Sequence, residues 1–182
     1  MRSKLYELRA DLLLLSVAIA WGVTFLMVQD AINSTPVYAF LFFRFGIASI
    51  LMFFIAYKYL NQINKRTIFY GVILGTFLFS AFATQTFGLL YTKSSIVAFI
   101  TGLNVIFVPF LAYLVFKDHI SKKVFIAAIV AVIGLYSLTM SGTLTVGIGE
   151  FLTSICAFLF ALQIIYTGKF SKEVNVFLLV LF

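Results

Sequence analysis

Two side chains that could do chemistry lie inside long apolar stretches of the sequence. Arg44 follows Pro36 by eight residues in an otherwise apolar run, and Asn104 lies near the middle of the run from Ile96 to Phe116. A full charge at the centre of a membrane helix costs about 2.5–3.5 kcal/mol on insertion scales, so Arg44 should face the interior of a helix bundle or water. We interpret Arg44 either as an anion-binding or gating residue or as a structural centre of hydrogen bonds.

Further polar side chains could complete a polar pathway with these two. Hydroxyl residues recur every four positions from Thr76 to Thr84, which places them on one face of a helix. Hydrogen bonding between helices, worth about 0.6 kcal/mol per contact on average, is the alternative interpretation of the same residues. We favour the pathway, and its candidate residues are Arg44, Ser80, Thr84, Gln85, Thr101 and Asn104.

Two other positions bear on the packing around such a pathway. Pro109 cannot donate to the carbonyl of Val105, so we expect a helix break at Pro109, about one turn beyond Asn104. Trp21 is followed by Gly22, which we interpret first as close helix packing and second as part of a cavity wall.

Several classes of chemistry have no support in the sequence. It contains one His and one Cys, and it lacks the signatures of nucleophilic hydrolases, zinc peptidases and phosphate-binding loops. We therefore expect no enzyme activity, no cofactor and no metal. The net charge of +7 would favour nucleic acid in a soluble protein, but here the basic residues lie in short loops between apolar runs, so we expect no nucleic-acid partner.

The composition requires a membrane. Hydrophobic residues make up 63% of the 182-residue chain and charged residues only 10%, whereas soluble domains carry about 25% charged residues. Each apolar run approaches the roughly 20 residues that cross a bilayer. We predict an all-α polytopic bundle with six complete spans and a truncated seventh. The predicted spans are 12–28, 36–57, 68–90, 96–116, 124–140, 150–166 and, incomplete, 174–182.

The basic residues predict the orientation of this bundle. Of the 13 Lys and Arg residues, only Lys93 lies in the loops on one side and Arg44 lies within a span. The other basic residues all fall on the opposite side, which is the cytoplasmic side by the positive-inside rule. We therefore predict a multi-pass protein of the inner or plasma membrane with a cytoplasmic N-terminus.

A weak internal repeat divides the chain. Aligning Asp11 with Glu150 places Trp21 on Phe160 and Gly22 on Ala161, an offset of five spans. An odd number of spans per repeat makes the second copy enter the membrane from the opposite side, as in inverted-repeat transporters.

The order of several short features resembles the EamA-type drug/metabolite transporter superfamily. These features are Trp21-Gly22 with Phe25, Arg44, Leu90-Tyr91-Thr92 with Ser94-Ser95, Ala98-Phe99, Pro109, Asp118, Gly134 and Glu150. The resemblance implies ten spans in two inverted five-span repeats, both termini in the cytoplasm, and transport of small metabolites or drugs. It implies a first repeat at residues 1–141 and the start of a second at 149–182. The chain departs from the family pattern at Lys117-Asp118, where a glutamate is usual.

These observations lead to two hypotheses for the function. The first is a secondary transporter that works by alternating access and exports a small polar or amphipathic metabolite or drug across the bilayer. It would be completed by a missing C-terminal half or by a second copy in a homodimer. The alternative is a non-transporting membrane scaffold or assembly partner, in which the polar residues only join helices. An enzyme embedded in the membrane is a distant third.

Overall fold

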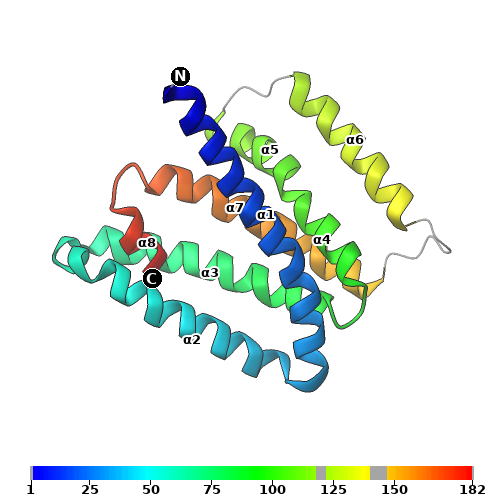
Figure 1. Ribbon diagram of the computed structural model, residues 1–182, viewed down its shortest axis with the longest axis horizontal. Coiled ribbons are helices and arrows are strands. Elements are labelled where there is room, and N and C mark those ends of the chain that lie inside the picture. The colour runs from blue at the N-terminus through cyan, green and yellow to red at the C-terminus, as the bar shows by residue number, and fades with distance from the viewer. Residues whose placement is uncertain (1, 118–121, 140–146, 182) are drawn as a thin grey trace.

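The computed structural model describes residues 2–117, 122–139 and 147–181, and in these ranges the regular structure is helical, without strands. The elements run along the chain as shown in Figure 1. They are α1 (Arg2–Ser34), α2 (Val37–Ala56), the 3₁₀ turn η1 (Tyr57–Gln62), α3 (Lys65–Gly88), α4 (Ser94–Gly102), α5 (Asn104–Phe116), α6 (Lys122–Thr139), α7 (Ile148–Phe170) and α8 (Val176–Leu181).

The lengths of these helices fit a bilayer. Five segments of the described chain are long and apolar enough to span it, and α4 and α5 together form one of them. The 18 residues of α6 also lie within the range of about 17–25 residues for a spanning helix. A bilayer leaves no water for backbone groups, so each span satisfies its own hydrogen bonds as a helix. The predicted all-α polytopic bundle is confirmed.

Helix α7 lies at the centre of the bundle. Its most extensive neighbours are α3, α5 and α4, and its spanning segment has the largest buried share of the five. In Figure 1, α7 runs behind α1, between α3 on one side and α4 and α5 on the other. The predicted sixth span is therefore the core on which α3, α4 and α5 pack.

Two glycines allow α3 and α7 to approach closely where α3 ends and α7 begins. A Cβ atom on Gly88 would lie 2.6 Å from Oγ1 of Thr153, and one on Gly149 would lie 2.8 Å from Cβ of Thr92. Separations below 3.0 Å are essentially never seen for a real Cβ atom. Any larger residue at either position would therefore push α3 and α7 apart.

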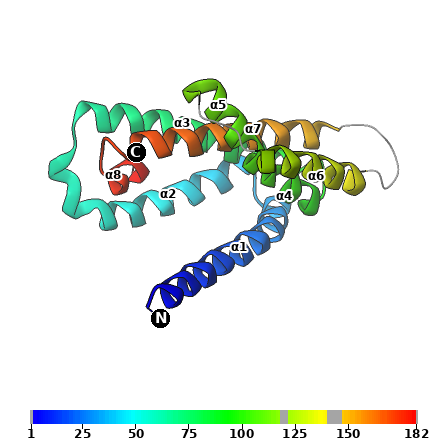
Figure 2. The same cartoon turned by 90° about the horizontal axis from the view of Figure 1, so that it is seen from above.

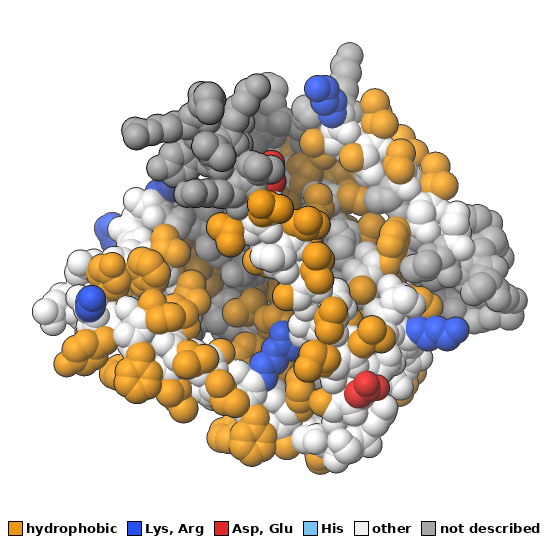
Figure 3. Space-filling model, viewed as in Figure 1, with side chains coloured by type: hydrophobic (Ala, Val, Ile, Leu, Met, Phe, Trp, Pro, Cys, Tyr) orange, Lys and Arg blue, Asp and Glu red, His pale blue; other side chains and the backbone are white. Residues whose placement is uncertain are grey.

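Helix α1 is longer than its predicted span of 12–28. It extends to Ser34, and its C-terminal half packs in a cluster in which Val28 and Ile32 meet Leu41 and Val97. Its N-terminal half leans away from the bundle in Figure 2 and exposes the side chains of Leu12–Leu15. Apolar side chains likewise cover most of the described surface seen in Figure 3. Such a surface is suited to lipid or to further apolar helices.

The predicted break at Pro109 is wrong in its position. Pro109 lies inside α5, whereas the helix changes at Leu103, between α4 and α5. The amide of Leu103 donates to the carbonyl of Ile100 at 3.0 Å, a three-residue step that tightens the turn before Asn104. Gly102, a poor helix former, directly precedes this turn.

The glycine contact predicts a position-specific loss of stability. Gly149→Ala should lower the free energy of unfolding by about 1–3 kcal/mol, because the added methyl group overpacks the α3–α7 interface. Gly168→Ala on the same helix is the matched control, because its Cβ would meet nothing within 4 Å. Unfolding of the purified protein in detergent measures both variants, and equal stability of the two would contradict this account of the interface.

Candidate functional site

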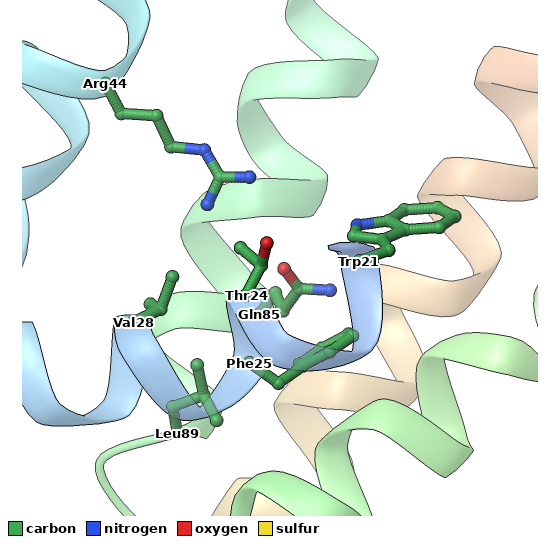
Figure 4. Close-up of a pocket in the computed structure, with 7 residues that line it drawn as sticks. All are labelled: Trp21, Thr24, Phe25, Val28, Arg44, Gln85 and Leu89. Carbon is green, nitrogen blue, oxygen red and sulfur yellow. The ribbon is translucent and has the colours of Figure 1, made fainter. Parts of the chain in front are cut away.

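Three of the predicted site residues meet at one small cavity. Arg44 from α2, Gln85 from α3 and Trp21 from α1 line it, together with Thr24 and Val28 of α1. Figure 4 shows the guanidinium of Arg44 pointing into the space above Thr24 and Gln85, with Trp21 on the far side. The cavity has a volume of about 10 Å³, which is room for about one water molecule. We call it the arginine pocket.

Arg44 is half-buried and rests on an aromatic ring. Its guanidinium carbon lies 4.0 Å from the centroid of the Phe82 ring. This cation–π contact is worth about 0.5–2 kcal/mol, depending on how far the charge is desolvated. No carboxylate of the described residues forms an ion pair with Arg44. The charge of Arg44 thus has an aromatic partner in this part of the chain but no counter-ion.

Gln85 connects the arginine pocket to α4. Its Nε2 atom donates a hydrogen bond of 3.2 Å to Oγ1 of Thr101, and the two residues are only 5% and 3% exposed. A buried amide must have hydrogen-bond partners to offset its desolvation, so this contact fixes the position of Gln85 beside Arg44. Thr101 therefore belongs to the same polar group, one hydrogen bond beyond the cavity.

The remaining predicted residues lie elsewhere. The hydroxyl of Thr84 donates to carbonyls of its own helix, at 2.9 Å to Ser80 and 3.0 Å to Ala81. Neither Ser80 nor Thr84 lines the arginine pocket. Asn104 is buried, but it shares a face of α5 with Leu111, which packs against α7. Asp118, which carried part of the family resemblance, lies outside the described residues.

A row of aromatic rings, missed by the sequence analysis, connects four helices beside the arginine pocket. Edge-to-face and tilted contacts of this kind are worth about 0.5–1.5 kcal/mol beyond the area they bury. The neighbouring ring centroids are 6.4, 5.1, 5.8 and 5.6 Å apart in the order Trp21, Phe160, Phe82, Phe45, Phe79. With 23 Phe residues in the chain, no local signal distinguishes these from the rings that face outward.

Gln29 is a further residue whose role the sequence analysis did not predict. Its Nε2 atom donates to the carbonyls of Leu89 and Thr92, and its Oε1 atom accepts from the amide of Ser94, each at 3.2 Å. One amide thus fastens α1 to the turn between α3 and α4. The only signal in the sequence is a glutamine one residue beyond the predicted end of the first span.

The same turn is also fastened to α7. The hydroxyl of Thr92 donates to the carboxylate of Glu150, which lies in the first turn of α7 and so faces the positive end of the helix dipole. Gln29 and Glu150 together hold α1, the α3–α4 turn and α7 in one network. We call this network the terminal clamp, since it lies where α1 and α3 end and α4 and α7 begin.

Comparison with known proteins gives one family and one curated relative. The model of the EamA-like transporter family matches residues 8–140. A protein named "Uncharacterized transporter" from Archaeoglobus fulgidus is 34% identical over 169 residues, which cover 93% of this chain and 52% of the relative. This chain therefore spans about half the length of that relative. No solved structure matches the chain significantly.

The terminal clamp predicts a role for Gln29 in stability. Gln29→Leu removes three interhelical hydrogen bonds, and at about 0.6 kcal/mol each it should lower the free energy of unfolding by about 2 kcal/mol. Asp30→Asn alters the neighbouring exposed side chain and serves as the control. Denaturation in detergent would show the difference, and an unchanged midpoint for Gln29→Leu would rule out the clamp.

Proposed function

Because the chain belongs to the EamA-like transporter family, we propose that it forms part of a secondary transporter that moves small molecules across the membrane by alternating access. Both the matching family and the relative are named transporters, in agreement with the lack of enzyme motifs. The five long apolar segments make it a multi-pass membrane protein. The substrate is a small polar or amphipathic metabolite or drug, and we propose that it is exported.

The observation that carries this proposal is the position of Arg44. A charged side chain without a counter-ion in the described residues lies beside a cavity at the junction of three helices. Polar groups within a membrane bundle are costly, and they commonly mark the route of a substrate or ion. We propose that Arg44 attracts an anionic or strongly polar group of the substrate, and that Gln85 and Thr101 hold its neighbouring hydrogen-bonding groups.

Alternating access requires two units that can move relative to each other. We propose that residues 1–141 form a first repeat and that residues 149–182 form the start of an inverted second repeat. The protein lies in the inner or plasma membrane, and its N-terminus is in the cytoplasm. The remaining helices come from a C-terminal half or from a second copy. Trp21 and Phe160 are aligned with each other when Asp11 is placed on Glu150, and the contact between their rings supports a substrate route at the junction of the proposed repeats.

The alternative of a non-transporting scaffold has one observation in its favour. Every fully buried side-chain nitrogen or oxygen of the described residues has a hydrogen-bond partner within the chain. In a scaffold, the bond between Gln85 and Thr101 would serve only to hold α3 against α4. The two functions differ in whether water and substrate ever reach the arginine pocket.

Flux through the complete protein tests the role of Arg44. In proteoliposomes screened with a panel of radiolabelled neutral and anionic metabolites, Arg44→Gln should reduce flux of a transported compound at least about tenfold, equivalent to ~1.4 kcal/mol. Arg44→Lys, which keeps the charge, should retain part of it. Asn104→Ala should have a smaller effect, because Asn104 lies outside the pocket. The lipid-facing change Phe42→Leu is the control. Unchanged flux in Arg44→Gln would remove this site assignment.

Labelling from water separates the two functions. In a background with Cys156→Ala, we expect a small maleimide to modify Gln85→Cys during transport, because the arginine pocket must open to one side of the membrane. Asn104→Cys, packed on the α7 side, should stay unmodified and is the internal control. A scaffold would leave both cysteines unmodified, and that result would favour the alternative.

A further inference from the structure

A second and larger cavity lies in the opposite half of the bundle from the terminal clamp. Its volume is about 190 Å³, and it is enclosed by α2, α3, α7 and α8. This is the half in which α2 and α7 end and α3 and α8 begin. The residues that shape it include Phe45, Ser49, Leu78, Phe79, Gln163 and Thr167. We call it the inner chamber.

The polar groups of the inner chamber are uncharged. Gln163 donates from Nε2 to Oγ1 of Thr167 at 3.1 Å, and the hydroxyl of Thr167 donates to the backbone carbonyl of Gln163 at 2.7 Å. One of the two Nε2 hydrogens of Gln163 and the hydroxyl hydrogen of Thr167 are thereby used within α7. In the described part of the chain, Oε1 of Gln163 and the hydroxyl of Ser49 make no hydrogen bond. The chamber thus offers a free amide acceptor, one amide N–H and a free hydroxyl among apolar walls.

The remaining walls of the inner chamber are apolar, and so is most of an adjoining outer groove. Phe45 and Phe79 contact each other with ring centroids 5.6 Å apart and form one wall. Ser49 and Leu181 also line an adjoining outer groove whose other residues, among them Ile50 and Phe53, are apolar. A charged molecule would lose its hydration in the chamber without gaining an opposite charge. The chamber therefore selects against charge.

The aromatic row separates the inner chamber from the arginine pocket. Phe45 lies in the wall of the chamber and contacts Phe82. The guanidinium of Arg44, which lines the arginine pocket, lies over the ring of Phe82. Arg44 and Phe45 are consecutive residues of α2. The two cavities are thus neighbours along the bundle, with rings from α2 and α3 between them.

We propose that the inner chamber is a binding site for small uncharged amphipathic molecules with a ring-sized apolar body and an N–H or O–H donor. The apolar body lies against Phe45, Leu78 and Phe79, and the donor is accepted by Oε1 of Gln163 or by the hydroxyl of Ser49. This inference rests on the proposed function in one respect, namely that the bound molecule is cargo. It adds a second, uncharged class of cargo, bound at a site separate from the one at which Arg44 holds a polar or anionic group.

Photolabelling of the complete protein in lipid nanodiscs tests the site without any measurement of flux. Three matched phenyldiazirine probes carry a carboxamide, a carboxylate or an aminomethyl group, and benzamide is the competitor. The carboxamide probe should label peptides that contain residues 74–79 and 163–167. Excess benzamide should suppress this labelling at least about tenfold, while labelling of the lipid-facing Phe42 and Phe43 should persist. The two charged probes should label the chamber at least about tenfold less.

Three variants connect the labelling to the structure. Leu78→Trp fills the chamber and should abolish the labelling that benzamide suppresses, whereas Leu26→Trp on the exposed face of α1 should leave it intact. Gln163→Leu keeps the volume, removes the acceptor and should weaken benzamide competition about tenfold. Absence of benzamide-sensitive labelling, or equal labelling by all three probes, would overturn the proposal. Substrate flux in the Arg44 variants tests the transporter assignment, and benzamide-sensitive labelling tests the inner chamber. The two proposals can therefore fail independently, each with its own experimental result.

Discussion

The close approach of α3 and α7 is the constraint on which the rest of the bundle depends, because lipid supplies no hydrophobic force to hold helices together. Within a bilayer, helices associate through hydrogen bonds and through tight packing, which small residues allow where backbones meet. Gly88 and Gly149 provide that contact at one end of the α3–α7 pair. Toward the other end, Leu74 of α3 and Phe170 of α7 lie in one buried cluster with Leu179 of α8. Helices α4 and α5 then pack on the opposite side of α7.

Hydrogen bonding gives this packing a defined arrangement. Gln29 and Glu150 bind the turn between α3 and α4 to α1 and α7, and Gln85 binds α3 to Thr101. Each of these polar groups would be costly in lipid without a partner, so each contact restricts how its helix can rotate. Arg44 is different, because it has an aromatic ring beneath it and no counter-ion in the described chain. A bundle that satisfies its fully buried polar groups and leaves this cation next to a cavity is suited to an external ligand.

The two cavities divide the bundle into chemically distinct halves. The arginine pocket presents a positive charge with an amide and a hydroxyl close by, whereas the inner chamber presents neutral polar groups among rings and aliphatic side chains. The aromatic row lies between them and connects α1, α7, α3 and α2. The row is therefore the boundary between the two cavities.

The sequence by itself determined the helical class and the approximate positions of the spans, because insertion of an apolar segment into lipid is a local property of about 20 residues. It also indicated that Arg44 should face the interior of a bundle or water. Only the tertiary structure decided that Arg44, Gln85 and Trp21 share a pocket while Ser80, Thr84 and Asn104 do not. It also moved the helix break from Pro109 to Leu103 and assigned Gln29 to the terminal clamp. The physical reason is that these features depend on the rotation and tilt of each helix against its neighbours. In spans that are apolar on every side, no hydrophobic stripe in the sequence encodes that rotation.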